Sequence, residues 1–227
     1  AIGAILLIKR QGIANLLCNA LGILASLLVI AASALYLSSG ASPITIRLME
    51  SAVPFLSVDI KADSLSMFFI LSLSILVLCV SIYSIQYISH YIGNKNVGVF
   101  YFLYATFILS MIFVFTSANA VFFYVSWEVM SVASYFLVIF DSEDKETQKA
   151  GTLYIIMTHI AAAFLLIGFA MIYSYTNSFD LFGSASAIPD GARNVLFILF
   201  LIGFGTKAGA IPFHIWLPQA HPAAPSN

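Results

Sequence analysis

Residues 96–140 contain one charged side chain, that of Glu128, and this scarcity of charge limits the possible folds. A single membrane span needs about 20 mostly apolar residues, so the stretch is too long for one crossing. The segment Ser117-Ala118-Asn119 offers the best break. The pattern therefore predicts two helices, at residues 98–116 and 120–140, joined by a tight turn.

The composition of the whole chain supports a lipid environment. Hydrophobic residues make up 61% of the sequence and charged residues 8%, whereas a soluble domain has about 25% charged residues. So few charges cannot cover a surface that faces water. The net charge of -1 also argues against nucleic acid as a partner, because phosphate binding needs a basic surface.

The remaining apolar runs predict further spans at residues 13–37, 64–89 and 150–174, and a last span that begins near Asn194. Residues 1–8 resemble the end of a truncated helix, closed by Lys9 and Arg10. The segment 141–149 is predicted to be a solvated loop. We therefore expect an all-α integral membrane bundle without a β-sheet, with six full or nearly full spans after the truncated helix. Because the chain begins at Ala1 and ends at Asn227, we also expect a fragment of a longer protein.

Lysine and arginine residues in the loops predict the orientation, since cytoplasmic loops carry an excess of them. One side holds five and the other holds three: Lys9, Arg10, Lys95, Lys145 and Lys149 against Arg47, Lys61 and Arg193. This bias places the loops at 9–12, 90–97 and 141–149 in the cytoplasm of a bacterial or archaeal cell.

The sequence offers no site for a cofactor or a metal. No flavin, haem, iron–sulfur or nucleotide motif is present in it. Cys18 and Cys79 both lie in apolar stretches and neither has a CxxC neighbour, which favours a packing role. Any electron transfer would therefore take place in a partner subunit.

Two charges lie where a membrane helix disfavours them. Glu128 is about eight residues, or roughly 12 Å, into its predicted helix, and Lys207 about 13 residues, or roughly 20 Å, into its own. An ionisable group at the bilayer centre costs at least about 2.5–3.5 kcal/mol on insertion scales. The functional interpretation is a buried Glu–Lys pair that carries protons. The structural alternatives are a paired carboxylate for Glu128 and a snorkelling lysine or counter-ion for Lys207.

Glycines and a proline surround the lysine. Gly205 and Gly209 flank Lys207, and Pro212 follows five residues after it. Proline interrupts a helix, and broken helices at membrane depth line wet cavities in transporters. The pattern predicts a broken helix here. The alternative is that the glycines only allow close helix packing.

Three histidines are candidates for a proton path. His159 lies in the middle third of its helix, where a proton relay and a hydrogen-bonded core residue are equally compatible with the sequence. His214 and His221 flank the predicted break and are candidate entrance residues.

Three segments resemble a known family: WEVMSVASYFLVIF, YIIMTHIAAAFLLIGF and GFGTKAGAIPFHIWLPQAHPAAPSN. They are similar to the proton-conducting, antiporter-like membrane subunits of complex I and of cation/proton antiporters. The THIAAAFLL and AHPAAPSN portions most resemble the large membrane subunit of the hydrogenase-four and formate hydrogenlyase type. The similarity is strong over residues 60–227 and looser before them.

The resemblance implies a fold and a function. In that family the fifth helix carries a glutamate and the broken seventh helix a lysine, positions that match Glu128 and Lys207. The family fold has two inverted repeats, so residues 1–96 would be N-terminal membrane helices and residues 97–227 an incomplete first repeat. The implied function is proton translocation by a non-redox subunit, with other membrane subunits and a peripheral hydrogenase or dehydrogenase arm as partners. A sodium/proton antiporter subunit and a purely structural membrane anchor are the alternatives.

Overall fold

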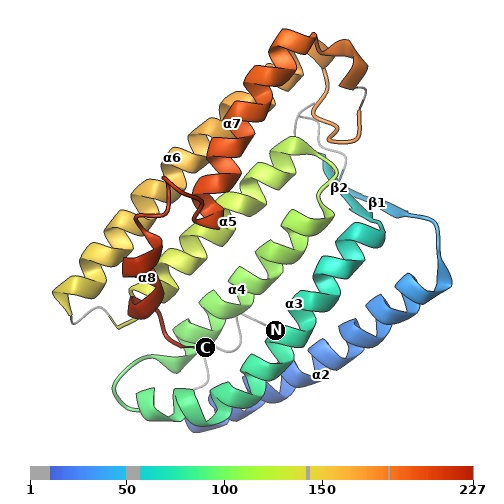
Figure 1. Cartoon of the computed structure of the whole chain (residues 1–227). Coiled ribbons are helices and arrows are strands. Elements are labelled where there is room, and N and C mark those ends of the chain that lie inside the picture. The colour runs from blue at the N-terminus through green and yellow to red at the C-terminus, as the bar shows by residue number, and fades with distance from the viewer. Residues whose placement is uncertain (1–10, 50–56, 142–143, 184, 227) are drawn as a thin grey trace. The chain divides into compact units, whose positions relative to one another are not determined.

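The computed structural model describes residues 11–49, 57–141, 144–183 and 185–226. The predicted helix at 1–8, with Lys9 and Arg10, lies outside the described residues. Figure 1 shows the helices and the two strands in the colours of their order along the chain. In chain order the elements are α2 (Gln11–Ser39), β1 (Ile44–Met49), β2 (Val58–Ala62), α3 (Ser64–Tyr87), η1 (Ile88–Tyr91), α4 (Val97–Thr116), α5 (Ala120–Val138), α6 (Lys145–Thr176), η2 (Ala185–Ala187), α7 (Asp190–Ala208) and α8 (Leu217–Ala223).

Six helices in the described part of the chain are long and apolar enough to cross a membrane: α2, α3 with η1, α4, α5, α6 and α7. The protein is therefore an integral membrane protein with a helical fold, as the sequence predicts. The predicted division of the longest apolar stretch is also confirmed. The side chain of Asn119 accepts hydrogen bonds from the backbone N–H groups of Val121 and Phe122, and so caps the first turn of α5.

The expectation of no sheet is wrong for the loop between α2 and α3, where β1 and β2 pair. β-Branched residues alternate with polar ones there, a pattern that suits strands outside the apolar spans. Arg47 and Asp59 join the two strands through an ion pair of 2.8 Å. Burial by itself would raise the pKa of Asp59, but hydrogen bonds from Ser57 and Arg47 and the charge of Arg47 lower it below its ordinary value.

Two helices begin earlier than the sequence predicts. α6 starts at Lys145, inside the predicted solvated loop, because the side chain of Asp144 caps it by accepting from the backbone N–H of Glu146. α7 starts at Asp190, directly after Pro189, which precedes the helix as its cap residue. Polar residues at helix ends are solvated in either conformation, so charge alone does not locate these ends.

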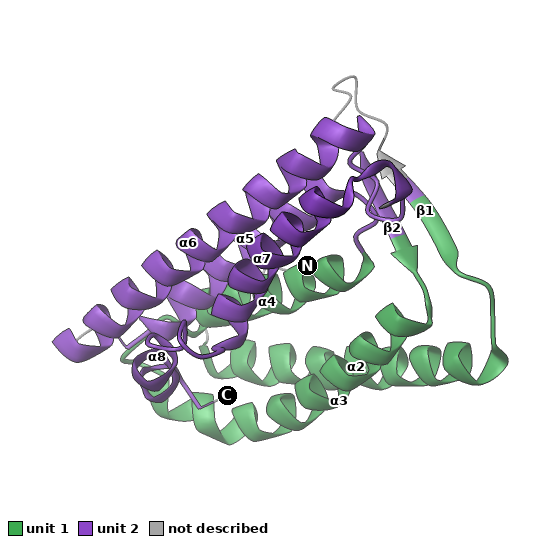
Figure 2. Ribbon diagram, turned by 45° about the horizontal axis from the view of Figure 1, so that its top comes forward, with its two compact units in different colours: residues 1–46, 61–116, 227 green, residues 47–60, 117–226 purple. Residues whose placement is uncertain are grey.

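The described chain packs as two compact units (Figure 2), and α2, α3 and α4 belong to the first of them. Its interior contains a hydrogen-bonded polar cluster. The amide of Asn19 donates to the Tyr101 hydroxyl over 2.6 Å, and that hydroxyl donates to Asn15 Oδ1 over 2.6 Å. Asn15 in turn donates to the backbone carbonyl of Ile85. Buried polar groups are stable only when they are paired in this way. The cluster therefore joins all three helices of this unit.

The second unit contains α5, α6, α7 and α8. Close packing of α6 against α7 depends on glycine: a Cβ at Gly203 would lie 3.1 Å from the backbone oxygen of Ala161 and 2.5 Å from Leu165. Glycine at this position therefore allows the two helices to approach closely. The division into units concerns packing, and the start of a repeat at residue 97 stays a prediction.

Candidate functional site

The predicted helix break is present at the end of α7. The helix stops at Ala208, and Gly209 caps it with a φ of 73°, a left-handed conformation that glycine adopts without steric cost. The backbone N–H of Ala210 donates to the carbonyl of Gly205 over 2.8 Å and closes the last turn. Pro212 lies in the non-helical segment that follows, and the chain is helical again from Leu217.

Trp216 ties the segment after the break back to α7. Its indole N–H donates over 2.8 Å to the backbone carbonyl of Thr206, which also accepts from the backbone N–H of Gly209 at the end of the helix. Both side chains are buried. The indole ring also lies edge-on to Tyr154, with centroids 5.1 Å apart. The break is therefore an ordered structure with a defined position against α6.

Lys207 lies in the last turn of α7, because this helix ends at Ala208, before the predicted break at Pro212. Its ammonium group, Nζ, donates to the hydroxyl of Tyr154 over 2.7 Å and is 3.4 Å from the hydroxyl of Ser131. The C-terminal end of a helix carries partial negative charge, which favours a cation there. The lysine is partly buried and is held by neutral oxygen atoms.

The hydroxyl of Tyr154 lies between Lys207 and α5. It is 2.5 Å from the hydroxyl of Ser134, which also donates to the backbone carbonyl of Ser131 over 2.9 Å. The tyrosine side chain is 4% exposed and packs with Val138, Trp216 and Ala220. Residues from α5, α6, α7 and the segment beyond the break thus meet at one phenol.

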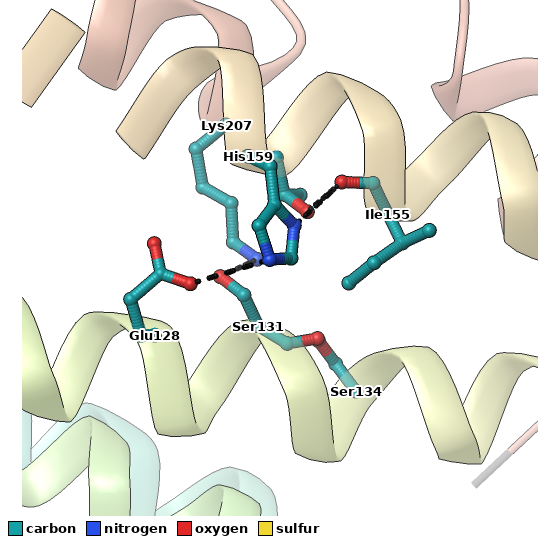
Figure 3. A network of polar contacts seen from close by, with 7 residues as sticks. Glu128, Ser131, Ser134, Ile155, His159 and Lys207 are labelled. Carbon is teal, nitrogen blue, oxygen red and sulfur yellow. Dashed lines mark hydrogen bonds and ion pairs between the residues drawn. The ribbon is translucent and has the colours of Figure 1, made fainter. Parts of the chain in front are cut away.

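Glu128 and His159 face each other from α5 and α6. Glu128 Oε2 is 3.7 Å from His159 Nε2, and the other ring nitrogen, Nδ1, is 2.9 Å from the backbone carbonyl of Ile155. Oε1 of Glu128 is buried and has no hydrogen-bond partner among the described residues. Figure 3 shows these two side chains and Lys207 directed into the same region.

The structure does not show the predicted direct ion pair between Glu128 and Lys207: in the described residues the carboxylate faces His159, and the ammonium contacts hydroxyl groups. The site therefore brings one acidic and two basic groups together without joining the acid to the lysine. This arrangement leaves the lysine charge without a fixed counter-ion inside the described part of the chain.

The two candidate entrance residues differ in their surroundings. His214 lies in the non-helical segment after Gly209, and its Nδ1 is buried without a hydrogen-bond partner in the described residues. His221 is exposed on α8. Neither residue has a contact that assigns it a role, and both stay predictions.

Sequence reasoning missed Tyr154, Ser131, Ser134 and Trp216 as parts of the site. Ser131 follows Glu128 by three residues and Ser134 follows Ser131 by three, so each serine neighbours the preceding member of this series on the surface of α5. That spacing is a usable signal. The contributions of Tyr154 and Trp216 depend on how α6 and the segment after α7 pack, and no local pattern reports this.

The fold and the site define a membrane bundle with a broken helix that carries a lysine. Residues 117–227 match the family described as NADH:quinone oxidoreductase/Mrp antiporter, TM. The match identifies this part of the chain with the antiporter-like membrane subunits, as the sequence resemblance implies.

Particular relatives support the assignment. Hydrogenase-4 component B of Escherichia coli (strain K12) is 39% identical over 175 residues, which are 76% of this chain and 26% of the relative. The protein mnhA2 of Staphylococcus aureus (strain JH9), named as an antiporter subunit, is 30% identical over 231 residues, covering 98% of this chain and 28% of the relative. The chain therefore spans about a quarter of the length of these relatives.

A solved structure shares the fold. A chain of the Mrp complex from Dietzia sp. DQ12-45-1b superimposes with a TM-score of 0.79 at 23% sequence identity, over 98% of this chain and 41% of that chain. The antiporter-like architecture predicted from the sequence is thereby confirmed.

Proposed function

We propose that the complete protein translocates protons across a membrane, with Lys207 as the group that takes up and releases the proton. One observation carries this proposal: the ammonium of Lys207 lies at the broken end of a membrane helix and contacts the neutral hydroxyls of Tyr154 and Ser131. A lysine fixed by a carboxylate would stay charged. A lysine in a neutral setting can change its charge when its surroundings change.

Two opposing effects act on such a lysine. Removal from water disfavours the charged ammonium, and an approaching carboxylate favours it. Glu128 lies one helical turn before Ser131, which Lys207 contacts, so movement or hydration between the carboxylate and the ammonium would switch the lysine between its two forms. The proposed Glu–Lys coupling therefore works through a changing separation and needs no permanent ion pair.

His159 is proposed to relay protons beside Glu128. A backbone carbonyl only accepts hydrogen bonds, so the contact between Ile155 and Nδ1 requires the hydrogen to be on Nδ1. Nε2 is then the nitrogen that gains or loses a proton, and it faces the carboxylate. The side chain of His159 is 55% exposed, which supports the relay interpretation over that of a core histidine.

The names of relatives guide the proposal for partners. Hydrogenase-4 component B is by its name part of a hydrogenase, which supports a complex with other membrane subunits and a peripheral redox arm. We place the complex in the cytoplasmic membrane, with the loops at 9–12, 90–97 and 141–149 in the cytoplasm. The backbone N–H of Gly93 donates to the side chain of Gln11, which supports a common side for the first two of these loops.

A sodium/proton antiporter subunit is the second candidate. The match to mnhA2 extends over 98% of this chain, further than the match to the hydrogenase component, and it favours this reading. Both candidates use the same lysine and differ in the energy source. Purification of the complete complex would separate them, because only the first predicts that redox subunits copurify.

The test of a proton-carrying role is the Lys207→Ala variant of the complete protein in its native complex. Proton pumping should be lost while the complex still assembles and electron transfer by its redox subunits continues. Lys149→Ala is a matched control, because Lys149 is an exposed lysine that pairs with Glu146 at the start of α6. Pumping at the parental level by Lys207→Ala would reject the proposal and favour a structural membrane anchor.

A further inference from the structure

The hydrogen bonds around Tyr154 have a defined direction. Ser134 donates its hydrogen to the backbone carbonyl of Ser131 and therefore receives the contact from Tyr154 as an acceptor. Tyr154 uses its hydrogen on Ser134, and its oxygen is then an acceptor for the ammonium of Lys207. The chain of donors runs from the lysine through the phenol and the serine to the carbonyl.

The phenol is the fixed member of this chain. Its ring packs in a buried cluster with Val138, Trp216 and Ala220, and the indole of Trp216 is itself bound to the end of α7. Lys207 reaches the phenol at the end of a flexible four-carbon stem. The side chain of Lys207 can therefore move between these hydroxyl groups and Glu128 while the phenol keeps its position.

We infer that Tyr154 and Ser134 form a hydroxyl seat that positions Lys207 in both of its protonation states. This inference rests on the proposed function of the lysine. The charged ammonium donates to the phenol, as the structure shows. A neutral amine has a lone pair, so the phenol can turn its hydrogen toward the amine while Ser134 turns its own hydrogen from the Ser131 carbonyl to the phenol oxygen.

Each hydrogen stays on its own oxygen in this rearrangement, so Tyr154 and Ser134 position the lysine without carrying the transported proton. A carboxylate seat would favour the charged form alone. The hydroxyl pair accepts either form, and this property lets the lysine return to one place after it releases its proton.

The experiment uses the complete complex and measures proton flux per folded complex in membrane vesicles. Tyr154→Phe keeps the ring that packs against Trp216 and removes the hydroxyl. Flux should fall about tenfold, which corresponds to about 1.4 kcal/mol, close to the value of one hydrogen bond to a charged group. Tyr135→Phe is the matched control, because Tyr135 packs against the same cluster and is not part of the donor chain.

A second pair of variants separates positioning from packing. Ser134→Ala removes the hydroxyl and should lower flux, whereas Ser134→Thr keeps it and should restore flux, since threonine in a helix can also donate to the carbonyl three residues before it. This pair decides the question if Tyr154→Phe fails to fold.

The outcomes distinguish this inference from the proposed function. If Lys207→Ala abolishes flux but Tyr154→Phe and Ser134→Ala pump like the parent, the hydroxyl seat is wrong and the lysine role stands. If the proton flux of Ser134→Thr is as low as that of Ser134→Ala, the serine acts through packing and the inference is overturned. If Lys207→Ala itself pumps normally, both ideas fail.

Discussion

Replacing Glu128 by glutamine removes one charge and changes little else. Glutamine has nearly the same shape as glutamate, so the packing of α5 is preserved. The carboxylate oxygen that lacks a partner among the described residues is buried, and a neutral amide is less costly to bury than a charge. We therefore expect the Glu128→Gln complex to assemble normally and to transfer electrons at the parental rate.

The size of the effect on pumping follows from the contact with His159 in its protonated form, the form in which this residue carries a charge. Two unit charges 4 Å apart attract by about 1 kcal/mol in bulk water and by about 4 kcal/mol at an effective dielectric constant of about 20. The observed separation is 3.7 Å, and the side chains of His159 and Glu128 are 55% and 24% exposed. This exposure places the pair near the lower value, so proton flux should fall about fivefold to tenfold.

The assay is the formation of a pH gradient by vesicles that contain the complete complex, divided by the amount of folded complex. Glu146→Gln is the matched control, because Glu146 is an exposed carboxylate that pairs with Lys149 near the start of α6. Its flux should equal that of the parent. Unchanged pumping in Glu128→Gln would refute the argument that this carboxylate acts on the basic groups beside it.

Two further predictions concern other parts of the molecule. His159→Ala should slow proton flux more than it lowers the yield of folded protein, and equal losses of both would favour a structural role. Asp63→Ala should destabilise α3 by about 1 kcal/mol, because Asp63 caps that helix by accepting from the backbone N–H of Ser66. That hydrogen bond, together with the Ser66 hydroxyl and the charge of Lys61, lowers the pKa of Asp63 against the opposing effect of burial. The stabilisation is therefore full above the ordinary pKa and is lost as pH falls through the lowered one, so the difference in Tm between parent and variant should shrink below about pH 4.

The membrane spans were predictable because each depends on a local property of the chain. Apolar runs of sufficient length identify the helices, and Asn119 marks the break between α4 and α5 by its capping side chain. Gly209 and Pro212 mark the break after α7 for a similar reason, since glycine permits the left-handed conformation that ends the helix and proline does not continue a helix. The short strands β1 and β2 were missed because the loop was assigned from its charged residues, although its β-branched residues alternate with polar ones.

The composition of the site was only partly predictable. A charged residue in an apolar run is conspicuous in the sequence, so Glu128 and Lys207 could be identified directly. Their partners could not, because the register between helices decides which side chains meet. Tyr154 is one tyrosine among 11, and its hydroxyl became important only through its distance of 2.7 Å from the lysine.

The most direct measurement of the central claim is proton pumping by the Lys207→Arg variant of the complete complex. Arginine keeps the positive charge and can still donate to the hydroxyls of Tyr154 and Ser131, but it does not lose its proton in proteins. A group that must alternate between charged and neutral forms cannot be replaced by one that is always charged. We therefore predict that Lys207→Arg assembles and fails to pump, as Lys207→Ala does. Pumping at the parental rate would show that Lys207 is a fixed counter-ion and would contradict the account.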